Sequence, residues 1–359
     1  MDAYGSRPKN GQATTVHRPV HRPCVRPQEC RMRRTASPLS LILLGIGTFL
    51  LVLAPMLAWY VTPRAAVNPV DIDTTAVYTG TGSVFDTEKI ATVPDQKITV
   101  TQRVRGNVAE SERSGNAVWD VITTVDTDES LPAADPHDAL DFTPHRWVMD
   151  RRTTRPVHCC EESPYIEGEA YLKFPFDVGK RSYQWWDNTG GTTVTMRYDG
   201  TEKVQGYTGY RFTGTVAPRK VGTRLVPGRL VDEPDRPQVL AEEWYSNHGF
   251  KLVVDQRTGR VIYAQTGPRR TLRAPGGEKD AAVLLDSEKI AFTTATQKEA
   301  VRQAKRDSGL LRTVGETAPI GAAVAGFVLA VVGGVLVVRG RKRPESSGTA
   351  EMPQPSLTM

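Results

Sequence analysis

Two adjacent cysteines are the reactive pair that stands out in this chain of 359 residues. Cys159 and Cys160 follow His158 and precede Glu161 and Glu162. Outside the cytoplasm, thiols meet an oxidising environment in which disulfides persist. Three arrangements are open: a disulfide between the two neighbours, two thiols that are free or pair with other molecules, and a metal site that uses the flanking His or Glu. The disulfide is the candidate pairing.

Paired carboxylates are the second pattern with chemical potential. Asp71 and Asp73, and Asp126 and Asp128, have the Asp-x-Asp spacing that binds divalent ions in sugar transferases, but a chain with 40 acidic residues yields such pairs by chance. The sequence lacks a P-loop, a nucleophile elbow, an HExxH motif and a dinucleotide-binding glycine pattern. We therefore predict that the protein is not an enzyme, with no catalytic residue, no metal site and no cofactor.

Clustered aromatic residues are the third pattern. The candidates for a groove that binds lipid or glycan are Tyr183, Trp185, Trp186, Trp244 and Tyr245. Large aromatic rings line such grooves because they combine apolar area with polar edges. The alternative is that these rings pack in the core and at the edges of a β-rich domain, which is the commoner place for such residues.

Two long apolar segments interrupt an otherwise water-compatible composition. Only 39% of the residues are hydrophobic and the mean hydropathy is −0.37, which excludes a transporter with many spans. Residues 41–61 and 320–338 carry no charged side chain, and ~20 apolar residues suffice for a helix to cross a bilayer. We predict a signal anchor that forms a transmembrane helix at 39–61, and a second transmembrane helix at 318–338. A cleaved signal peptide would have a shorter apolar core of ~7–15 residues.

Flanking charges predict how these segments are oriented. Arg33 and Arg34 precede the first segment, Trp59 and Tyr60 stand at its far end, and four basic residues follow the second segment. Basic residues accumulate on the cytoplasmic side of spans, and aromatic rings favour the interface. We expect a protein of the cytoplasmic membrane with both termini in the cytoplasm and the central domain outside it.

The positive net charge of +6 comes from the two ends of the chain. Residues 1–38 contain eight basic and two acidic side chains, and residues 339–359 contain four and two. The central part is therefore slightly acidic, and we predict no nucleic-acid partner. The Pro-, Arg- and His-rich composition of 1–38 predicts a disordered basic tail, and 339–359 a short basic cytoplasmic tail.

Period-two alternation predicts a mostly β structure for residues 62–317. Segment 97–104 places Ile98, Val100 and Val104 on one face, and 192–198 alternates in the same way. Further segments rich in β-branched and aromatic residues are predicted strands: 118–125, 145–149, 170–174, 207–216, 240–245, 250–255 and 260–265. The fold class is α+β, a β-rich extracytoplasmic domain between two transmembrane α-helices.

Two short segments share the frame Asp-x-Arg-Thr-x-Arg, at 150–155 and 255–260. Each predicts a hairpin turn that begins at the Asp, because Asp and Thr side chains bond locally to turn backbone. Gly259 suits the second turn since glycine adopts positive φ without strain.

One further helix is predicted near 297–311, close to the second span. Thr296 and Glu299 form a capping-box pattern. The residues that recur on one helical face are Val301, Ala304, Ser308 and Leu311. Gly309 and Gly315 are expected to allow a bend before the span.

Small residues repeat every four positions in the second span. Gly326, Ala330 and Gly334 form the small-xxx-small pattern that lets two helices approach closely. The partner is either the first span of the same chain or the second span of another copy, so a homo-oligomer is one of the two possibilities.

Several motifs in fixed order resemble one protein family. They are Phe174-Pro175-Phe176-Asp177, Tyr183-Gln184-Trp185-Trp186-Asp187, residues 198–212, Trp244-Tyr245-Ser246-Asn247 and residues 254–261. In these motifs the chain resembles the actinobacterial two-span membrane proteins of unknown function labelled the porin PorA family, over roughly residues 39–343. The resemblance implies membership of the cell envelope and an accessory role in lipoglycan or envelope assembly.

Topology and aromatic clusters together predict a binding function. We expect a non-enzymatic cell-envelope membrane protein that contacts membrane lipids and binds a lipid, a lipid-linked glycan or an envelope protein at the outer face of the membrane. Two competing functions are an envelope glycan-modifying enzyme and a structural scaffold for a membrane complex. Two helices per chain enclose no pore by themselves, so a channel is not expected.

Overall fold

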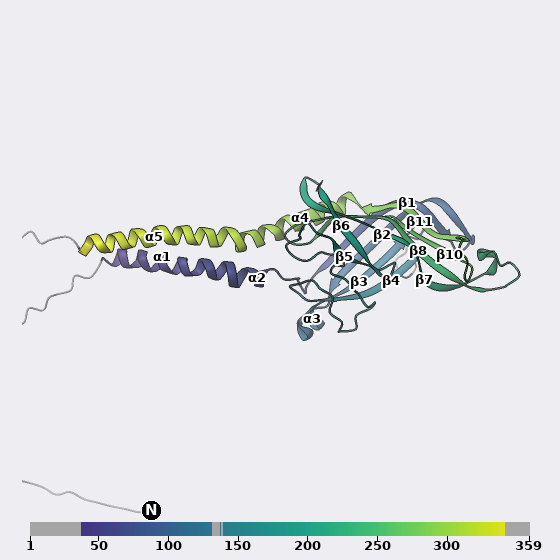
Figure 1. Cartoon of the computed structure of the whole chain (residues 1–359), viewed down its shortest axis with the longest axis horizontal. Helices are drawn as coiled ribbons and strands as arrows, with labels where there is room; N and C mark the ends of the chain where they lie inside the picture. Colours follow the sequence, from purple (N-terminus) through teal and green to yellow (C-terminus); the bar gives the residue numbers. More distant parts are fainter. Residues whose placement is uncertain (1–36, 131–136, 138, 342–359) are drawn as a thin grey trace, which may run out of the picture.

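The computed structural model describes residues 37–130, 137 and 139–341. The disordered state predicted for 1–38 and the tail predicted at 339–359 therefore lie almost wholly outside the described residues. The described chain consists of two long helices that project side by side from a β-rich domain (Figure 1).

Each long helix is built from two α-helical parts joined by a π turn. The first comprises α1 (Pro38–Met56), η1 (Leu57–Val61) and α2 (Thr62–Ala65), and the second comprises α4 (Thr294–Arg312), η4 (Thr313–Thr317) and α5 (Ala318–Arg341). Both are long and apolar enough to cross a membrane, over Pro38–Ala65 and within Thr294–Arg339. The apolar segments at 39–61 and 318–338 are helical as predicted. Gly309 and Gly315, where a bend is expected, both lie in helical segments, Gly309 in α4 and Gly315 in η4.

The two π turns lie opposite each other where the helices meet the domain. Pro55 has no N–H to donate within α1, and the helix widens just after it. A Cβ at Gly315 in η4 would lie 2.9 Å from Cγ2 of Thr62. Gly315 therefore serves the close approach of the two helices.

Eleven strands of the described chain form one antiparallel sheet. They are β1 (Asp73–Asp86), β2 (Ala91–Gly106), β3 (Ala117–Asp126), β4 (Asp141–Met149), β5 (Tyr183–Asp187), β6 (Thr192–Val204), β7 (Tyr207–Val226), β8 (Val239–Val254), β9 (Val261–Thr266), β10 (Pro268–Arg273) and β11 (Ala282–Phe292). The order is β4-β3-β2-β1-β11-β10-β8-β7-β6-β5, and β9 pairs with β11 and β8. Strands β1 and β11 meet in the middle, so the beginning and end of the domain pair directly.

Most predicted strands are confirmed in place. Segment 97–104 lies in β2, 192–198 in β6, and 240–245 together with 250–255 in the single strand β8. The strand predicted at 170–174 is wrong. This segment crosses between sheet edges, where Ala170 N–H donates to the Gln184 carbonyl and Phe174 N–H donates to the Gly259 carbonyl.

The connection 150–182 bridges the two outermost strands of the curved sheet. Trp119 of β3 and Trp147 of β4 lie edge to face at 5.4 Å, and Tyr171 of the connection is 5.4 Å from Trp147. Trp186 of β5 belongs to the same buried cluster. The aromatic cluster therefore joins the two edges of the sheet through this connection.

Helix α4 docks against the outside of β8 and β9. Val301 and Ala304 are buried against Val253 and Ile262. The helix cap is Thr293, whose hydroxyl accepts from Thr296 N–H, so the capping box predicted at Thr296 is wrong. Helix α4 starts directly after β11, and Thr296 instead bonds to the backbone of Val77 in β1.

Two shorter helices complete the described domain, α3 (Val108–Ser114) and the 3-10 turn η3 (Gly228–Val231). Asn107 caps α3 by accepting from Glu110 N–H, and Gly115 ends it with a φ of 75°. Val231 of η3 packs with Val239 and Ala241 of β8.

The two Asp-x-Arg-Thr-x-Arg segments adopt the same turn. Asp150 and Asp255 each accept from the Thr three residues later, and the position after that Thr has positive φ, 64° at Thr154 and 72° at Gly259. Only the second turn leads into a full return strand, β9. The hairpin prediction is therefore confirmed at 255–260, whereas the segment after Thr154 forms an isolated bridge.

Candidate functional site: a cavity along the inner face of the sheet

A cavity with a volume of about 840 Å³ follows the inner face of the curved sheet. Strand alternation supplies its wall, because every second side chain points to the same face. In β2 the lining residues are Val100, Gln102 and Val104, and in β1 they include Thr74, Ala76 and Tyr78. Aromatic and aliphatic side chains from β3, β5, β8 and β11 extend this wall, and they include Trp119, Trp185, Leu252, Ile290 and Phe292.

One end of the cavity reaches both long helices. Ala65 and Val67 line it directly after the first helix, and Leu310 and Leu311 line it in the last turn of α4. Leu310 is 58% exposed. The cavity therefore connects the inner face of the sheet to the level at which the apolar helices begin.

The other end is polar and lies near Asp187. A Cβ on Gly190 would lie 2.9 Å from both Asp187 Oδ2 and Tyr245 Cε1, so these two side chains are neighbours. Helix α4 covers Val253 of β8, and Tyr245 lies eight residues away from Val253 in the same strand. Eight residues of a strand span roughly 25 Å. Polar atoms at the two ends of the cavity are thus well separated.

Burial controls protonation at this remote end. Asp187 is 6% exposed, and its Oδ2 has no hydrogen-bond partner among the described residues. Burial raises the pKa of the Asp187 carboxyl to about 6, because the charged form loses hydration. Burial also lowers the pKa of His145, which lies within 3.4 Å of Asn188 Nδ2. Arg270 in the same region is already paired with Asp141 and Glu243.

A basic pair, Lys173 and Arg260, lies on the wall at the end next to α4. The two residues form an isolated antiparallel bridge, so their backbones are adjacent. Lys173 Nζ donates to Asn68 Oδ1 at 2.6 Å and lies 3.8 Å from the centre of the Phe176 ring. Arg260 binds Asp307 of α4 at 3.0 Å, while its buried Nε has no partner among the described residues.

Burial also sets the charge state of Lys173. Burial and, second to it, repulsion from the neighbouring Arg260 guanidinium together lower the Lys173 pKa to about 7. Within the described chain no carboxylate lies in ion-pair distance of Lys173, whereas Asp307 pairs with Arg260, Asp73 with Arg103, and Glu299 with Arg302.

The motifs at 174–177 and 254–261 meet and position this basic pair. Phe174 N–H donates to the Gly259 carbonyl at 2.8 Å, and Asp177 N–H donates to the Arg257 carbonyl at 3.0 Å. A Cβ at Gly259 would overlap the carbonyl oxygens of Phe174 and Pro175. Glycine is therefore needed both for the positive φ and for the close contact with the first motif.

The five predicted aromatic residues separate into three positions. Trp185, Trp186 and Tyr245 line the cavity, Tyr183 is buried in the core against Phe174, and Trp244 lies on the other face of β8. The Arg273 guanidinium stacks 3.9 Å from the centre of the Trp244 ring. The sequence thus predicted three aromatic residues of the cavity wall, but it could not distinguish them from Tyr183 in the core and Trp244 on the outer face.

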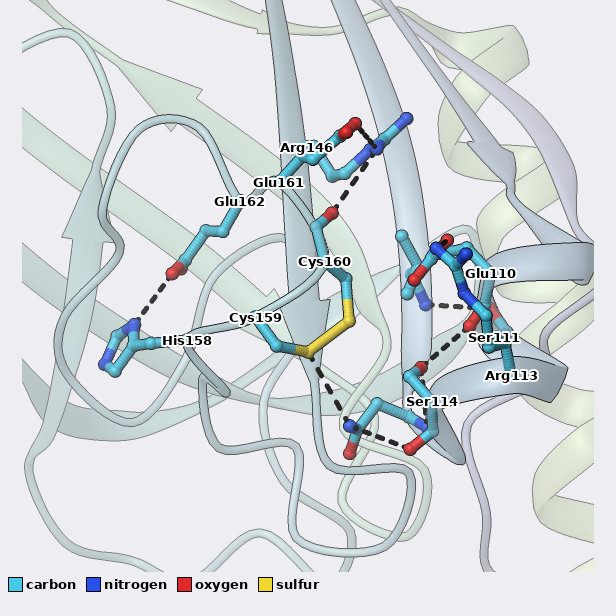
Figure 2. The surroundings of a disulfide bond; sticks show 12 residues. Glu110, Ser111, Arg113, Ser114, Arg146, His158, Cys159, Cys160, Glu161 and Glu162 are labelled. Atoms are coloured by element: carbon cyan, nitrogen blue, oxygen red, sulfur yellow. Dashed lines mark hydrogen bonds and ion pairs between the residues drawn. A yellow bond between two sulfur atoms is a disulfide. The ribbon is translucent and has the colours of Figure 1, made fainter.

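Cys159 and Cys160 are joined by a disulfide away from the cavity (Figure 2). Arg146 lies beside them, donating to the Cys160 carbonyl and to Glu161, and it also pairs with Asp120. His158 binds Glu162 at 2.7 Å on the other side. The flanking His and Glu therefore point to partners other than the two sulfur atoms.

The predicted carboxylate pairs do not converge. Asp73 pairs with Arg103, Asp128 with Lys97, and Asp126 accepts from Ser130, while Asp71 is exposed. No group of three potential ligands for a metal ion exists in the described part of the chain. These acids supply no clustered acid–base site.

Comparison with known proteins agrees with the sequence motifs. A sequence profile described as Porin PorA matches residues 39–335, from the first apolar helix to near the end of the second. The chain belongs to the porin PorA family. A protein named Porin PorA from Corynebacterium resistens (strain DSM 45100 / JCM 12819 / GTC 2026 / SICGH 158) is 25% identical over 234 residues. The match covers 54% of this chain and 55% of the relative, so the PorA-family chain spans about half the length of that relative.

The helix pair of this PorA-family chain packs through glycines. A Cβ on Gly47 would lie 2.8 Å from Ala330 Cα and 2.9 Å from the Gly326 carbonyl oxygen. Gly333 makes a similar approach to Leu44, whereas a Cβ on Gly334 would contact nothing within 4 Å. Two of the three predicted small residues, Gly326 and Ala330, thus face the first span of the same chain.

Sequence reasoning missed the polar groups that give the cavity its character. Asn68 had no signal, since single polar residues next to apolar segments are common. The other three did have one, because Asp187 and Arg260 lie within motifs that resemble the porin PorA family and Lys173 directly precedes one. Their meeting depends on contacts between residues far apart in sequence.

Proposed function

We propose that this chain is a non-enzymatic envelope membrane protein whose β domain takes up the apolar chain of a membrane lipid. The observation that carries the proposal is the cavity of about 840 Å³, which runs along an apolar sheet face and ends beside both long helices. Apolar cavities with a few placed polar groups are the usual form of ligand sites. A lipid would enter at the end lined by Ala65, Val67, Leu310 and Leu311.

The orientation of the protein in the membrane supports entry of a lipid into the cavity from the bilayer. We infer that both termini are cytoplasmic and that residues 62–317 lie outside the cytoplasmic membrane, because the tails are basic and the two helices run antiparallel. Leu310 and Leu311 then stand near the outer headgroup level. Their exposure would cost free energy in water and is favourable in contact with lipid.

The name of the relative, a porin, suggests a channel as a second function. We favour lipid binding because the two long helices of one chain are in backbone contact at Gly47 and Gly326. A pore needs a closed barrel or a ring of helices around a lumen. A channel would therefore need several copies of this helix pair.

An envelope enzyme and a scaffold for a membrane complex are two further candidate functions. The separate partners of Asp73, Asp126 and Asp128 favour binding over catalysis, because general acid–base chemistry needs acids that converge on one substrate atom. A scaffold would bind an envelope protein or a lipid-linked glycan through its outer surfaces, and then the cavity would stay without lipid.

Lipid carriage can be measured by native mass spectrometry of the full chain in detergent. We expect lipid-sized mass increments on the wild-type protein. Ala76 lines the cavity from β1 and is half-buried there, so Ala76→Trp fills space that the lipid needs and should lower its occupancy several-fold. Ala91→Trp, at the exposed start of β2, is the matched control and should retain the wild-type level.

Two results would contradict the proposal. One is a wild-type protein that carries no lipid even after incubation with excess phospholipid. The other is equal lipid occupancy in the Ala76→Trp and Ala91→Trp variants, which would place the lipid on the surface of the helices. A stable co-purified protein partner with an empty cavity would support the scaffold.

A further inference from the structure

The cavity wall contains a partly buried lysine that has no ion-pair partner among the described residues. Lys173 lines the cavity, and its ammonium group donates, within the described chain, only to the Asn68 amide oxygen. An ammonium group has three donors, so donors remain available on the cavity side. Removing a cation from water without an ion-pair partner costs free energy, and native proteins rarely keep one without a functional reason.

The neighbouring Arg260 adds a second unused donor. One arm of its guanidinium binds Asp307, while Nε is buried and unpaired among the described residues. The side chains of Lys173 and Arg260 start from adjacent backbone positions. Together they place two basic side chains next to each other on the cavity wall, and the Lys173 ammonium keeps unused N–H donors there.

Other charged groups near this end of the cavity have partners elsewhere. Glu299 pairs with Arg302 and Asp73 pairs with Arg103. Asp255 keeps its negative charge, but it accepts from Tyr207 and from Thr258 within its own turn. Among the described residues, no carboxylate therefore forms an ion pair with the Lys173 ammonium.

We propose that Lys173 and Arg260 bind the phosphate of a lipid headgroup while the acyl chain of that lipid occupies the apolar cavity. This inference rests on the proposed lipid uptake and adds the chemical class of the headgroup. Lysine and arginine are the side chains that bind phosphate, through charge-assisted hydrogen bonds. The remote end is unsuited to phosphate, because Arg270 there is paired twice and an ionised Asp187 would repel an anion.

The position of the pair matches the level of a lipid headgroup. Arg260 is tied to Asp307, one helical turn before Leu310 and Leu311, which precede the apolar part of the second long helix. Bound phosphate would also favour the charged form of Lys173, whose pKa burial lowers to about 7 in the free protein.

The test compares two lipids with the same acyl chains, dioleoyl phosphatidic acid and dioleoylglycerol, which differ only by the phosphate. We expect the wild-type chain to bind phosphatidic acid at least about tenfold more tightly, as one charge-assisted hydrogen bond allows. Lys173→Met should bring the two affinities within about twofold of each other without weakening dioleoylglycerol. Lys173→Met removes a buried unpaired cation and leaves Arg260 paired with Asp307, so we expect it to fold.

Lys251→Met is the matched control, because Lys251 points to the other face of β8 and pairs with Glu202. It should retain the wild-type preference. A third arm adds inorganic phosphate as competitor. Release of phosphatidic acid at low millimolar phosphate would mean that the pair takes the anion without the lipid chain, and it would overturn the assignment to a headgroup.

The outcomes separate this inference from the proposed function. Equal binding of the two lipids by the wild-type chain, or a preference that survives in both Lys173→Met and Arg260→Gln, overturns the headgroup site and leaves lipid uptake intact. Binding of neither lipid overturns lipid uptake itself.

Discussion

At the scale of single residues, Asp187 makes the sharpest prediction. Its carboxyl is buried and Oδ2 is unpaired in the described chain, and its pKa is raised to about 6. The folded state therefore binds the proton of the Asp187 carboxyl more tightly than the unfolded state does. The contribution of this proton to the free energy of unfolding is full below pH ~4 and is lost as the pH rises through about 6. Asp187→Asn removes this titration. We expect the variant to have a higher free energy of unfolding than wild type at pH 7, by about 2–3 kcal/mol.

Denaturant unfolding of the full chain in detergent at pH 4.5 and pH 7 measures this effect. Asp95→Asn is the control, because Asp95 is exposed and its positive φ of 55° suits Asn. It should change the unfolding free energy by less than ~0.5 kcal/mol at both pH values. A gain for Asp187→Asn that is the same at pH 4.5 and pH 7 would refute the protonation argument.

At the scale of elements, the contact between α1 and α5 decides the geometry of the helix pair. A Cβ on Gly47 would meet backbone atoms of Ala330 and Gly326, which cannot move aside as a flexible side chain can. Gly47→Ala should therefore push the two helices apart. Gly45 on the same helix has nothing within 4 Å of its Cβ position, so Gly45→Ala should be harmless.

Cysteine cross-linking measures this separation, with one cysteine at Thr62 and one at Gly315, where a Cβ would lie 3.9 Å from the Cβ of residue 62 and would meet only a side chain. We expect fast cross-linking in the background of wild type and of Gly45→Ala, and a several-fold slower reaction with Gly47→Ala. Equal rates in all three backgrounds would show that the helix pair is not held by this glycine contact.

At the scale of the whole molecule, orientation in the membrane is the testable property. Because the helices are antiparallel and adjacent, the start of α1 and the end of α5 lie at the same end of the helix pair, away from the domain (Figure 1). A lysine reagent that cannot cross membranes should label Lys89 and Lys298, which are exposed, when applied to cells with permeabilised outer layers. Lys9 and Lys342 in the two tails should react only in inside-out vesicles. The reverse pattern would overturn the proposed orientation, and lipid would then enter from the cytoplasmic leaflet.

Local sequence patterns specify where the membrane-length helices and the strands of this protein lie. Long uncharged runs specify membrane-length helices because an isolated bilayer span must be apolar along its whole length. Alternation in 97–104 specifies a strand with Ile98, Val100 and Val104 inside, because side chains alternate across a sheet. The order of the Phe174 and Val254 motifs also specified the family.

Only the tertiary structure decided what these segments build. The cavity arises because β1 pairs with β11 and the connection 150–182 closes the gap between β4 and β5, and both contacts join residues far apart in sequence. The same long-range packing buries Asp187, aligns Lys173 with Arg260, and turns Trp185 inward but Trp244 outward. Local pattern cannot fix these features, since burial and charge pairing depend on neighbours that only the folded chain brings together.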